Sequence, residues 1–146
     1  MEYFSTRNNQ IRKSFTDILF QGLSSDGGLF LPISWPSIDI NMLRNKSYEE
    51  VALNIICPFV AEEISVNILH EIINNTYKNF SNKKIAPLVT LQNHQHILEL
   101  FYGPTLAFKD YALQFLGNLF SHFMKNQDKK ITILGATSGD TGSAAI

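Results

Sequence analysis

Cysteine is almost absent from this chain of 146 residues, in which Cys57 is the single example. One cysteine excludes an intrachain disulfide and a zinc site built on several cysteines. Cys57 stands in the apolar run 53–57, so we expect it to be a small buried hydrophobic residue.

Long apolar runs are missing as well. No stretch approaches the roughly 18–20 apolar residues of a membrane span, so we expect no membrane partner. The N-terminus carries Glu2 and no apolar segment, so no secretory signal is expected. Together with the scarcity of cysteine, these features favour a cytoplasmic location.

Neither sign of charge dominates the chain. It has 12 basic and 13 acidic residues, for a formal net charge of −1, which gives no reason to expect nucleic acid or an anionic membrane as a partner. A hydrophobic fraction of 45% and a charged fraction of 17% are typical of a soluble globular protein. The length suits one ordinary domain, or a small domain and part of a second.

Helix signals dominate the first 80 residues. Residues 14–17 match a capping box and predict a helix that ends near Gly22. A second capping signal at Ser47 predicts a helix to about Cys57, where Pro58 is expected to end it or start the next turn. A third helix is predicted from apolar positions at helical spacing after Ser65: Ile68, Leu69, Ile72, Ile73, Thr76, Tyr77 and Phe80. With short strands expected at 1–7 and 29–31, we predict a mostly helical domain over residues 1–85.

The pattern changes over residues 86–146. In order, we predict strands over 87–91 and 97–101, a helix over 107–126, a strand over 130–134, a glycine-rich turn over 135–142 and the start of another helix. Strand, helix and strand in this order predict a βαβ unit with a parallel pair, so the fold class is α/β. A parallel sheet this small cannot cover both its faces, so we expect the front part of a longer protein or a truncated one.

Lys109 is the first candidate for chemistry. Residues 98–110 predict an apolar strand, a Gly-Pro turn and a helix start that carries this lysine. The partial positive charge at a helix N-terminus disfavours the ammonium form relative to the neutral amine, which is the form that attacks a carbonyl. Position alone also suits a solvated surface lysine.

The turn 136–142 is the second candidate. It joins a strand end to a helix start, where free N–H groups favour an anion and hydroxyls from Thr137, Ser138 and Thr141 can donate. A tight turn with Asp140 or Thr141 as helix N-cap explains the same residues. The glycine spacing fits neither the dinucleotide fingerprint nor the nucleotide P-loop.

Histidine offers little for a metal site. His94 and His96 would lie on one side of a strand, but no cysteine and no clear acidic partner stands nearby, so we predict no metal.

Three segments taken together resemble threonine synthase. They are residues 5–7 with 22–32, residues 101–110 continuing to Gln114, and residues 136–142. The Gly-Pro-Thr-x-Ala-Phe-Lys-Asp motif is highly specific, and the N-terminal pattern distinguishes this family from related lyases and dehydratases. The resemblance covers essentially the whole chain but only the front third or so of a family member.

The resemblance implies a pyridoxal 5′-phosphate enzyme of fold type II, similar to the tryptophan synthase β subunit. Lys109 would form a Schiff base with the cofactor, with Phe108 and Asp140 beside it. Thr137, Ser138, Gly139 and Thr141 would bind the substrate, O-phosphohomoserine, which reacts with water to give threonine and phosphate. Lys109 would also carry protons at Cα and Cβ of the substrate.

The resemblance also implies an incomplete site. In the family, the loop that holds the cofactor phosphate and the hydroxyl partner of the pyridine nitrogen lie downstream of the segment matched here. The chain alone is therefore expected to bind the cofactor poorly and not to turn over. Alternatives are a non-catalytic fragment that acts as a binding module, and another fold-type-II lyase or dehydratase. Neither a monomer nor a dimer is favoured.

Overall fold

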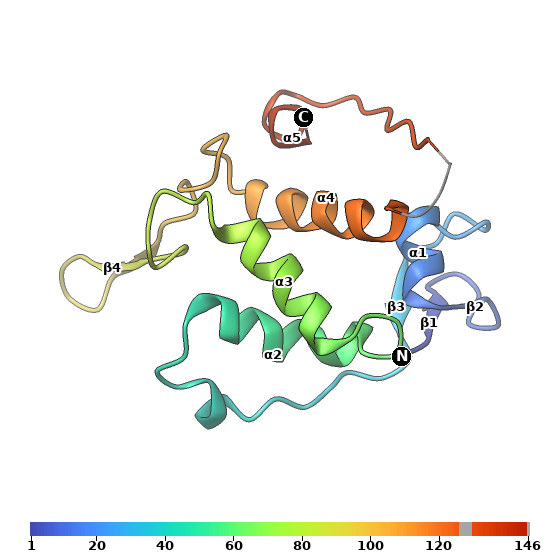
Figure 1. Ribbon diagram of the computed structural model, residues 1–146, viewed down its shortest axis with the longest axis horizontal. Helices are drawn as coiled ribbons and strands as arrows, with labels where there is room; N and C mark the ends of the chain where they lie inside the picture. The colour runs from blue at the N-terminus through green and yellow to red at the C-terminus, as the bar shows by residue number, and fades with distance from the viewer. Residues whose placement is uncertain (126–129, 146) are drawn as a thin grey trace. The chain divides into compact units, whose positions relative to one another are not determined.

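A computed structural model describes residues 1–125 and 130–145 and contains both helices and small sheets (Figure 1). Contacts divide the chain into two compact units. Unit 1 comprises Met1–Lys46 and Glu50–Leu69, and unit 2 comprises Ser47–Glu49 and His70–Ile146. The units are defined by contacts alone, and the predicted domains 1–85 and 86–146 stay a prediction.

Unit 1 contains a three-stranded antiparallel sheet in the order β2–β1–β3, built from β1 (Tyr3–Ser5), β2 (Arg12–Lys13) and β3 (Phe30–Pro32). Side chains alternate between the faces of a strand, and here Tyr3 and Ser5 are buried on one of them. The predicted N-terminal strand is confirmed. The strand predicted at 29–31 corresponds to β3. It extends to Pro32 because β3 is an edge strand, where a proline is tolerated.

Asp26 links the two segments of the N-terminal pattern, residues 5–7 and 22–32. The Ser5 hydroxyl donates to both carboxylate oxygens at 2.8 and 2.9 Å, and the Gly28 N–H donates to Oδ1 at 2.9 Å. Arg7 donates to the Asp26 carbonyl at 3.1 Å, and Gly27 has a φ of 77°, which glycine adopts without strain. The hydrogen bond from Gly28 holds the pKa of Asp26 below its usual value. These contacts therefore explain why the two segments of the N-terminal pattern, residues 5–7 and 22–32, occur together: they are bonded to each other within unit 1.

The three predicted helices of the first half form in the predicted order: α1 (Phe15–Gln21), α2 (Tyr48–Val60) and α3 (Val66–Tyr77). A short 3-10 helix that was not predicted, η1 (Ile40–Leu43), lies between α1 and α2 in the sequence. The capping box at Ser14 is confirmed, and Gly22 caps the C-terminus of α1. Helix α2 runs past its predicted end near Cys57 to Val60, and Pro58 belongs to its last turn, which is one of the two outcomes expected of that proline. A proline in the last turn has no N–H for the carbonyl four residues back, so α2 lacks that one hydrogen bond and ends within the same turn.

Trp35 is the single tryptophan and belongs to unit 1. Its ring meets Phe59 edge-on at a centroid distance of 6.2 Å, yet 71% of the residue is exposed. Trp35 therefore lies on the surface of the unit and contributes little to its core.

Glu63 caps α1 from a distant part of the sequence within unit 1. Its Oε1 accepts the N–H of Phe15 at 2.7 Å, and its Oε2 accepts the N–H of Thr16 at 2.9 Å. Burial raises the pKa of Glu63, but hydrogen bonds from Thr16, Phe15 and Ser14 outweigh it and leave the pKa below its usual value. The ionised carboxylate thus stabilises the start of the helix.

We expect Glu63→Gln to lower the free energy of unfolding by about 1 kcal/mol at pH 7, the usual cost of a lost cap. The folded pKa lies below the unfolded value near 4.5. The stabilisation is therefore present above that value and is lost as the pH falls through the folded pKa. Thermal midpoints measured from pH 7 to pH 3 should converge for the parent and the variant at the acid end. Glu71→Gln, at an exposed position on α3, is the control, and an equal loss there would contradict the assignment.

Unit 2 contains a hairpin of β4 (Leu88–Thr90) and β5 (His96–Leu98), followed by α4 (Asp110–Met124) and α5 (Asp140–Ala145). The hairpin is antiparallel, and all six of its residues are exposed. The predicted parallel βαβ pair is wrong for the residues described here. Residues 130–137 form no strand, because no described strand lies alongside to pair with them.

Helix α4 differs from its prediction at the start. It begins at Asp110 rather than Ala107, because residues 103–109 form tight turns in which Leu106 has a φ of 62°. That left-handed conformation interrupts a helix. Its described part ends at Met124, and the predicted end at residue 126 lies outside the described residues.

Aromatic rings form the core of unit 2. Tyr77 lies 4.8 Å from Tyr48 and 5.3 Å from Phe80 between ring centroids, and Phe80 lies 4.9 Å from Tyr111. The Tyr77 hydroxyl donates to the Tyr111 carbonyl at 3.1 Å, and the Tyr111 hydroxyl donates to the Ile85 carbonyl at 2.6 Å. These contacts hold the first turn of α4 against the end of α3.

Candidate functional site

A cavity of about 450 Å³ lies in unit 2 at the start of α4. Three predicted site residues, Phe108, Lys109 and Thr141, contribute to its walls. The other lining residues are mostly apolar or aromatic: Tyr48, Leu100, Tyr111, Ala112 and Leu113. A concave, largely apolar space of this size with a few polar groups is typical of a small-molecule site.

Lys109 occupies the N-cap position of α4, at the helix start that the sequence predicted but just before the first turn rather than within it. Its side chain is 29% exposed, and its Nζ lies 3.9 Å from Oδ2 of Asp140. The same Nζ lies 4.6 Å from the ring centroid of Phe108, a cation–π distance. Lys109, Phe108 and Asp140 are therefore brought together, and both contacts are of the kind that an ammonium group makes.

The turn before α5 is organised by Thr137. Its Oγ1 accepts the N–H of Gly139 at 3.2 Å and the N–H of Gly142 at 3.0 Å. Gly139 has a φ of 135°, which suits glycine, and its carbonyl accepts the Ser143 N–H at 2.9 Å. The helix cap considered for Asp140 or Thr141 is supplied by Thr137 instead, because its Oγ1 accepts the N–H groups of both Gly139 and Gly142.

The remaining predicted residues lie apart from the cavity wall. Ser138 and Gly139 are exposed and do not line the cavity, whereas Thr141 does. The Thr137 hydroxyl is already engaged in the turn.

Sequence reasoning missed Tyr48 and Tyr111 as lining residues. Burial raises the pKa of both phenols above the usual value, so each stays protonated beside Lys109. Tyr111 follows Lys109 by two residues and could have been found by following the first turn of α4. Tyr48 is remote in the sequence, and only the fold brings it to Tyr111, at a centroid distance of 6.3 Å.

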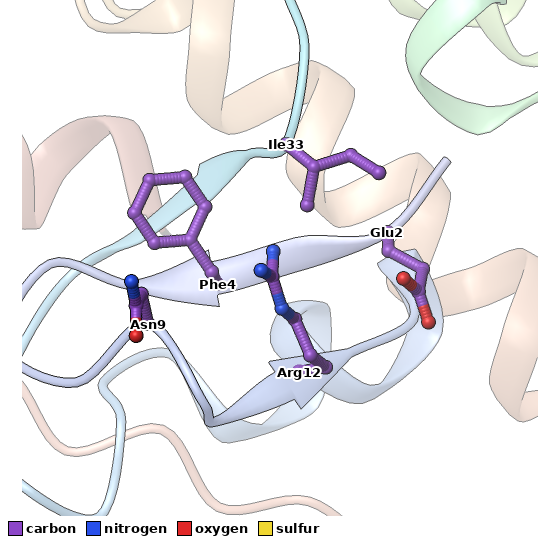
Figure 2. Close-up of a pocket in the computed structure, with 5 residues that line it drawn as sticks. All are labelled: Glu2, Phe4, Asn9, Arg12 and Ile33. Atoms are coloured by element: carbon purple, nitrogen blue, oxygen red, sulfur yellow. The ribbon is translucent and has the colours of Figure 1, made fainter.

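A second hollow, of about 370 Å³, lies on the sheet of unit 1 (Figure 2). Glu2, Phe4, Asn9, Arg12 and Ile33 line it. The Arg12 guanidinium lies between the Phe4 ring and Ile33, 5.5 Å from the ring centroid. None of the predicted site residues lines this hollow, so the candidate site is the cavity of unit 2.

Within residues 1–125 and 130–145, no three His, Cys, Asp or Glu side chains are grouped to hold a metal ion. Over the same described ranges, no helix combines the length and apolar character needed to cross a membrane.

The comparisons with known proteins match this chain to threonine synthases. The family described as threonine synthase N terminus matches residues 2–77. Threonine synthase from Pseudomonas aeruginosa is 44% identical over 149 residues, a match that covers 100% of this chain and 32% of that protein. The crystal structure of PLP-bound threonine synthase from Brucella melitensis aligns with a TM-score of 0.93 and 42% identity, over 99% of this chain and 32% of that one. Yeast threonine synthase aligns with a TM-score of 0.90 and 41% identity, over the same shares.

The fold of the chain is shared with solved threonine synthases, which are enzymes. The family match covers more than half of the chain, and the chain belongs to the threonine synthase family. It spans about a third of the length of the relatives that it matches.

Proposed function

We propose that the chain is the N-terminal part of a threonine synthase that uses pyridoxal 5′-phosphate. The reaction converts O-phosphohomoserine and water into threonine and phosphate, and a cytoplasmic location belongs to the same proposal. The observation that carries it is Lys109 in the wall of the cavity, in a chain 42% identical to a threonine synthase crystallised with this cofactor.

The residues present fit the cofactor. The cavity offers a primary amine on Lys109, the Phe108 ring next to it, and a hydroxyl on Thr141. Its volume is within the range of cofactor sites, about 300–1,000 Å³. We extend the proposal to the fold-type-II arrangement and to the domains 1–85 and 86–146, which the likeness to the solved threonine synthases supports.

Each residue has a defined task in this proposal. Lys109 bonds the cofactor through Nζ and, when free, moves protons at Cα and Cβ of the substrate, while Phe108 packs beside the cofactor ring. Asp140 lies within 3.9 Å of Nζ and orients the amine. The cofactor, when bound, supplies the electron sink for loss of the Cα proton. The turn from Thr137 to Thr141, with Ser138 and Gly139, would face the substrate carboxylate at the start of α5, with Thr141 lining the cavity and the Thr137 hydroxyl holding the turn.

The test is borohydride trapping of pyridoxal phosphate on the 146-residue chain, followed by peptide mapping. We expect substoichiometric labelling that prefers Lys109 over the exposed Lys78, because the cavity favours the cofactor next to that amine. No threonine should form from O-phosphohomoserine, since the chain covers 32% of its relatives. Equal labelling of Lys109 and Lys78 would refute the proposed role of Lys109. Threonine formation by this chain alone would refute the part that treats its site as incomplete.

A further inference from the structure

Asp110 is a fully buried acidic residue next to the candidate lysine. It is the first residue of α4 and is 0% exposed. Within the described residues, no basic side chain forms an ion pair with it. A buried carboxylate without such a pair needs hydrogen bonds to both oxygens. Asp110 is thus held by its local hydrogen bonds alone.

Both hydrogen bonds come from one residue. The Thr105 N–H donates to Oδ2 of Asp110 at 2.9 Å, and the Thr105 hydroxyl donates to Oδ1 at 2.7 Å. A carboxylate that accepts two bonds from the same residue fixes that residue in position and orientation. The pair therefore closes the loop 105–110 on itself.

Gly103 shows how tightly the loop closes. A Cβ at this position would collide with the Asp110 side chain, so the backbone of the Gly-Pro turn lies directly against the carboxylate. The preceding carbonyl, that of Tyr102, accepts the Ser81 N–H at 2.9 Å and so anchors the other end. Leu106 in between has a φ of 62°, a costly conformation that persists only where its surroundings impose it.

We propose that Asp110 is the positioning residue for Lys109. Its carboxylate holds Thr105 and Gly103 in place, and the closed loop presents the amine of Lys109 to the cavity. Lys109 directly precedes Asp110, so the clamp sets the backbone position of Lys109, whereas Asp140 and Phe108 contact its Nζ. The inference rests on the proposed function, because it concerns the lysine to which that function assigns the cofactor.

The test compares four variants of the 146-residue chain. Asp110→Asn replaces one carboxylate oxygen, Thr105→Val removes the hydroxyl bond, and Thr105→Ser keeps both bonds. Asp39→Asn is the matched control, since that aspartate caps the Asn41 N–H in unit 1 at 2.9 Å. Circular dichroism verifies that each variant folds. If Asp110→Asn does not fold, the result for Thr105→Val decides the test.

The readout is the ratio of trapped pyridoxal phosphate on Lys109 to that on Lys78. We expect Asp110→Asn and Thr105→Val to lower this ratio about tenfold, which corresponds to the loss of one hydrogen bond to a charged group. Thr105→Ser and Asp39→Asn should leave it unchanged. Amide exchange at Thr105 should accelerate about tenfold in Asp110→Asn for the same reason. An unchanged ratio in Asp110→Asn, or an equal fall in Asp39→Asn, would overturn the inference.

Acetylation by acetic anhydride separates this inference from the proposed function, because that reagent needs no cofactor site. If Lys109 of the parent chain is not preferred by pyridoxal phosphate, the proposed function fails and the acetylation ratio of Lys109 to Lys78 decides the positioning. Release of the loop should raise the acetylation ratio of Lys109 to Lys78 about threefold, because the Lys109 side chain is only 29% exposed in the folded parent chain. An unchanged acetylation ratio in Asp110→Asn would overturn the positioning role.

Discussion

Replacing Lys109 with alanine is expected to abolish the preference of pyridoxal phosphate for this part of the chain. The variant removes the only amine among the described residues that line the cavity while leaving the aromatic lining in place. Labelling after borohydride reduction should then fall to the level of the exposed lysines. Mass mapping of the reduced chain measures this loss. An adduct of undiminished yield in the same peptide region would contradict the assignment.

Two further variants define why the amine matters. Lys109→Arg keeps a positive charge near Asp140 and Phe108, but a guanidinium does not form the covalent bond. It should therefore lose the label as completely as alanine does. Lys78→Ala removes an exposed lysine that donates to Asn75 at 3.0 Å, and the label on Lys109 should be unaffected.

Truncation of Ile73 is expected to cause the largest loss of stability. Ile73 lies on α3 with 0% exposure, and Ile73→Ala should lower the free energy of unfolding by about 3 kcal/mol through lost burial and a residual cavity. Ile68→Ala on the same helix is the matched control, because Ile68 is 36% exposed and should cost less than about 1 kcal/mol. Urea unfolding monitored by circular dichroism measures both changes. Equal shifts for the two variants would contradict the burial argument.

Local signals in the sequence were sufficient where a few neighbouring residues determine the structure. The capping box at Ser14 sets the start of α1 because its bonds span three residues. Of the seven positions at helical spacing after Ser65, Ile68 is exposed and the other six are buried: Leu69, Ile72, Ile73, Thr76, Tyr77 and Phe80. Lys109 was placed at a helix start for the same local reason.

Features that depend on distant partners were not predictable. The strand expected at 130–134 needs a neighbour to pair with, and Leu134 is 96% exposed among the described residues. Tyr48 reaches the cavity from a segment 61 positions before Lys109, a distance over which periodicity carries no information. The late start of α4 depends on Leu106 in a left-handed conformation, which the sequence gives no reason to expect of a leucine.

The exposed indole of Trp35 gives the chain a built-in optical reporter for unit 1. Four of the five tyrosines, Tyr48, Tyr77, Tyr102 and Tyr111, belong to unit 2, and two of them line the cavity. Selective excitation of the indole therefore follows unit 1, whereas difference absorption of the phenols is dominated by unit 2, with Tyr3 of unit 1 as the remaining contribution. The two halves of a single unlabelled sample can be observed separately during unfolding or ligand titration.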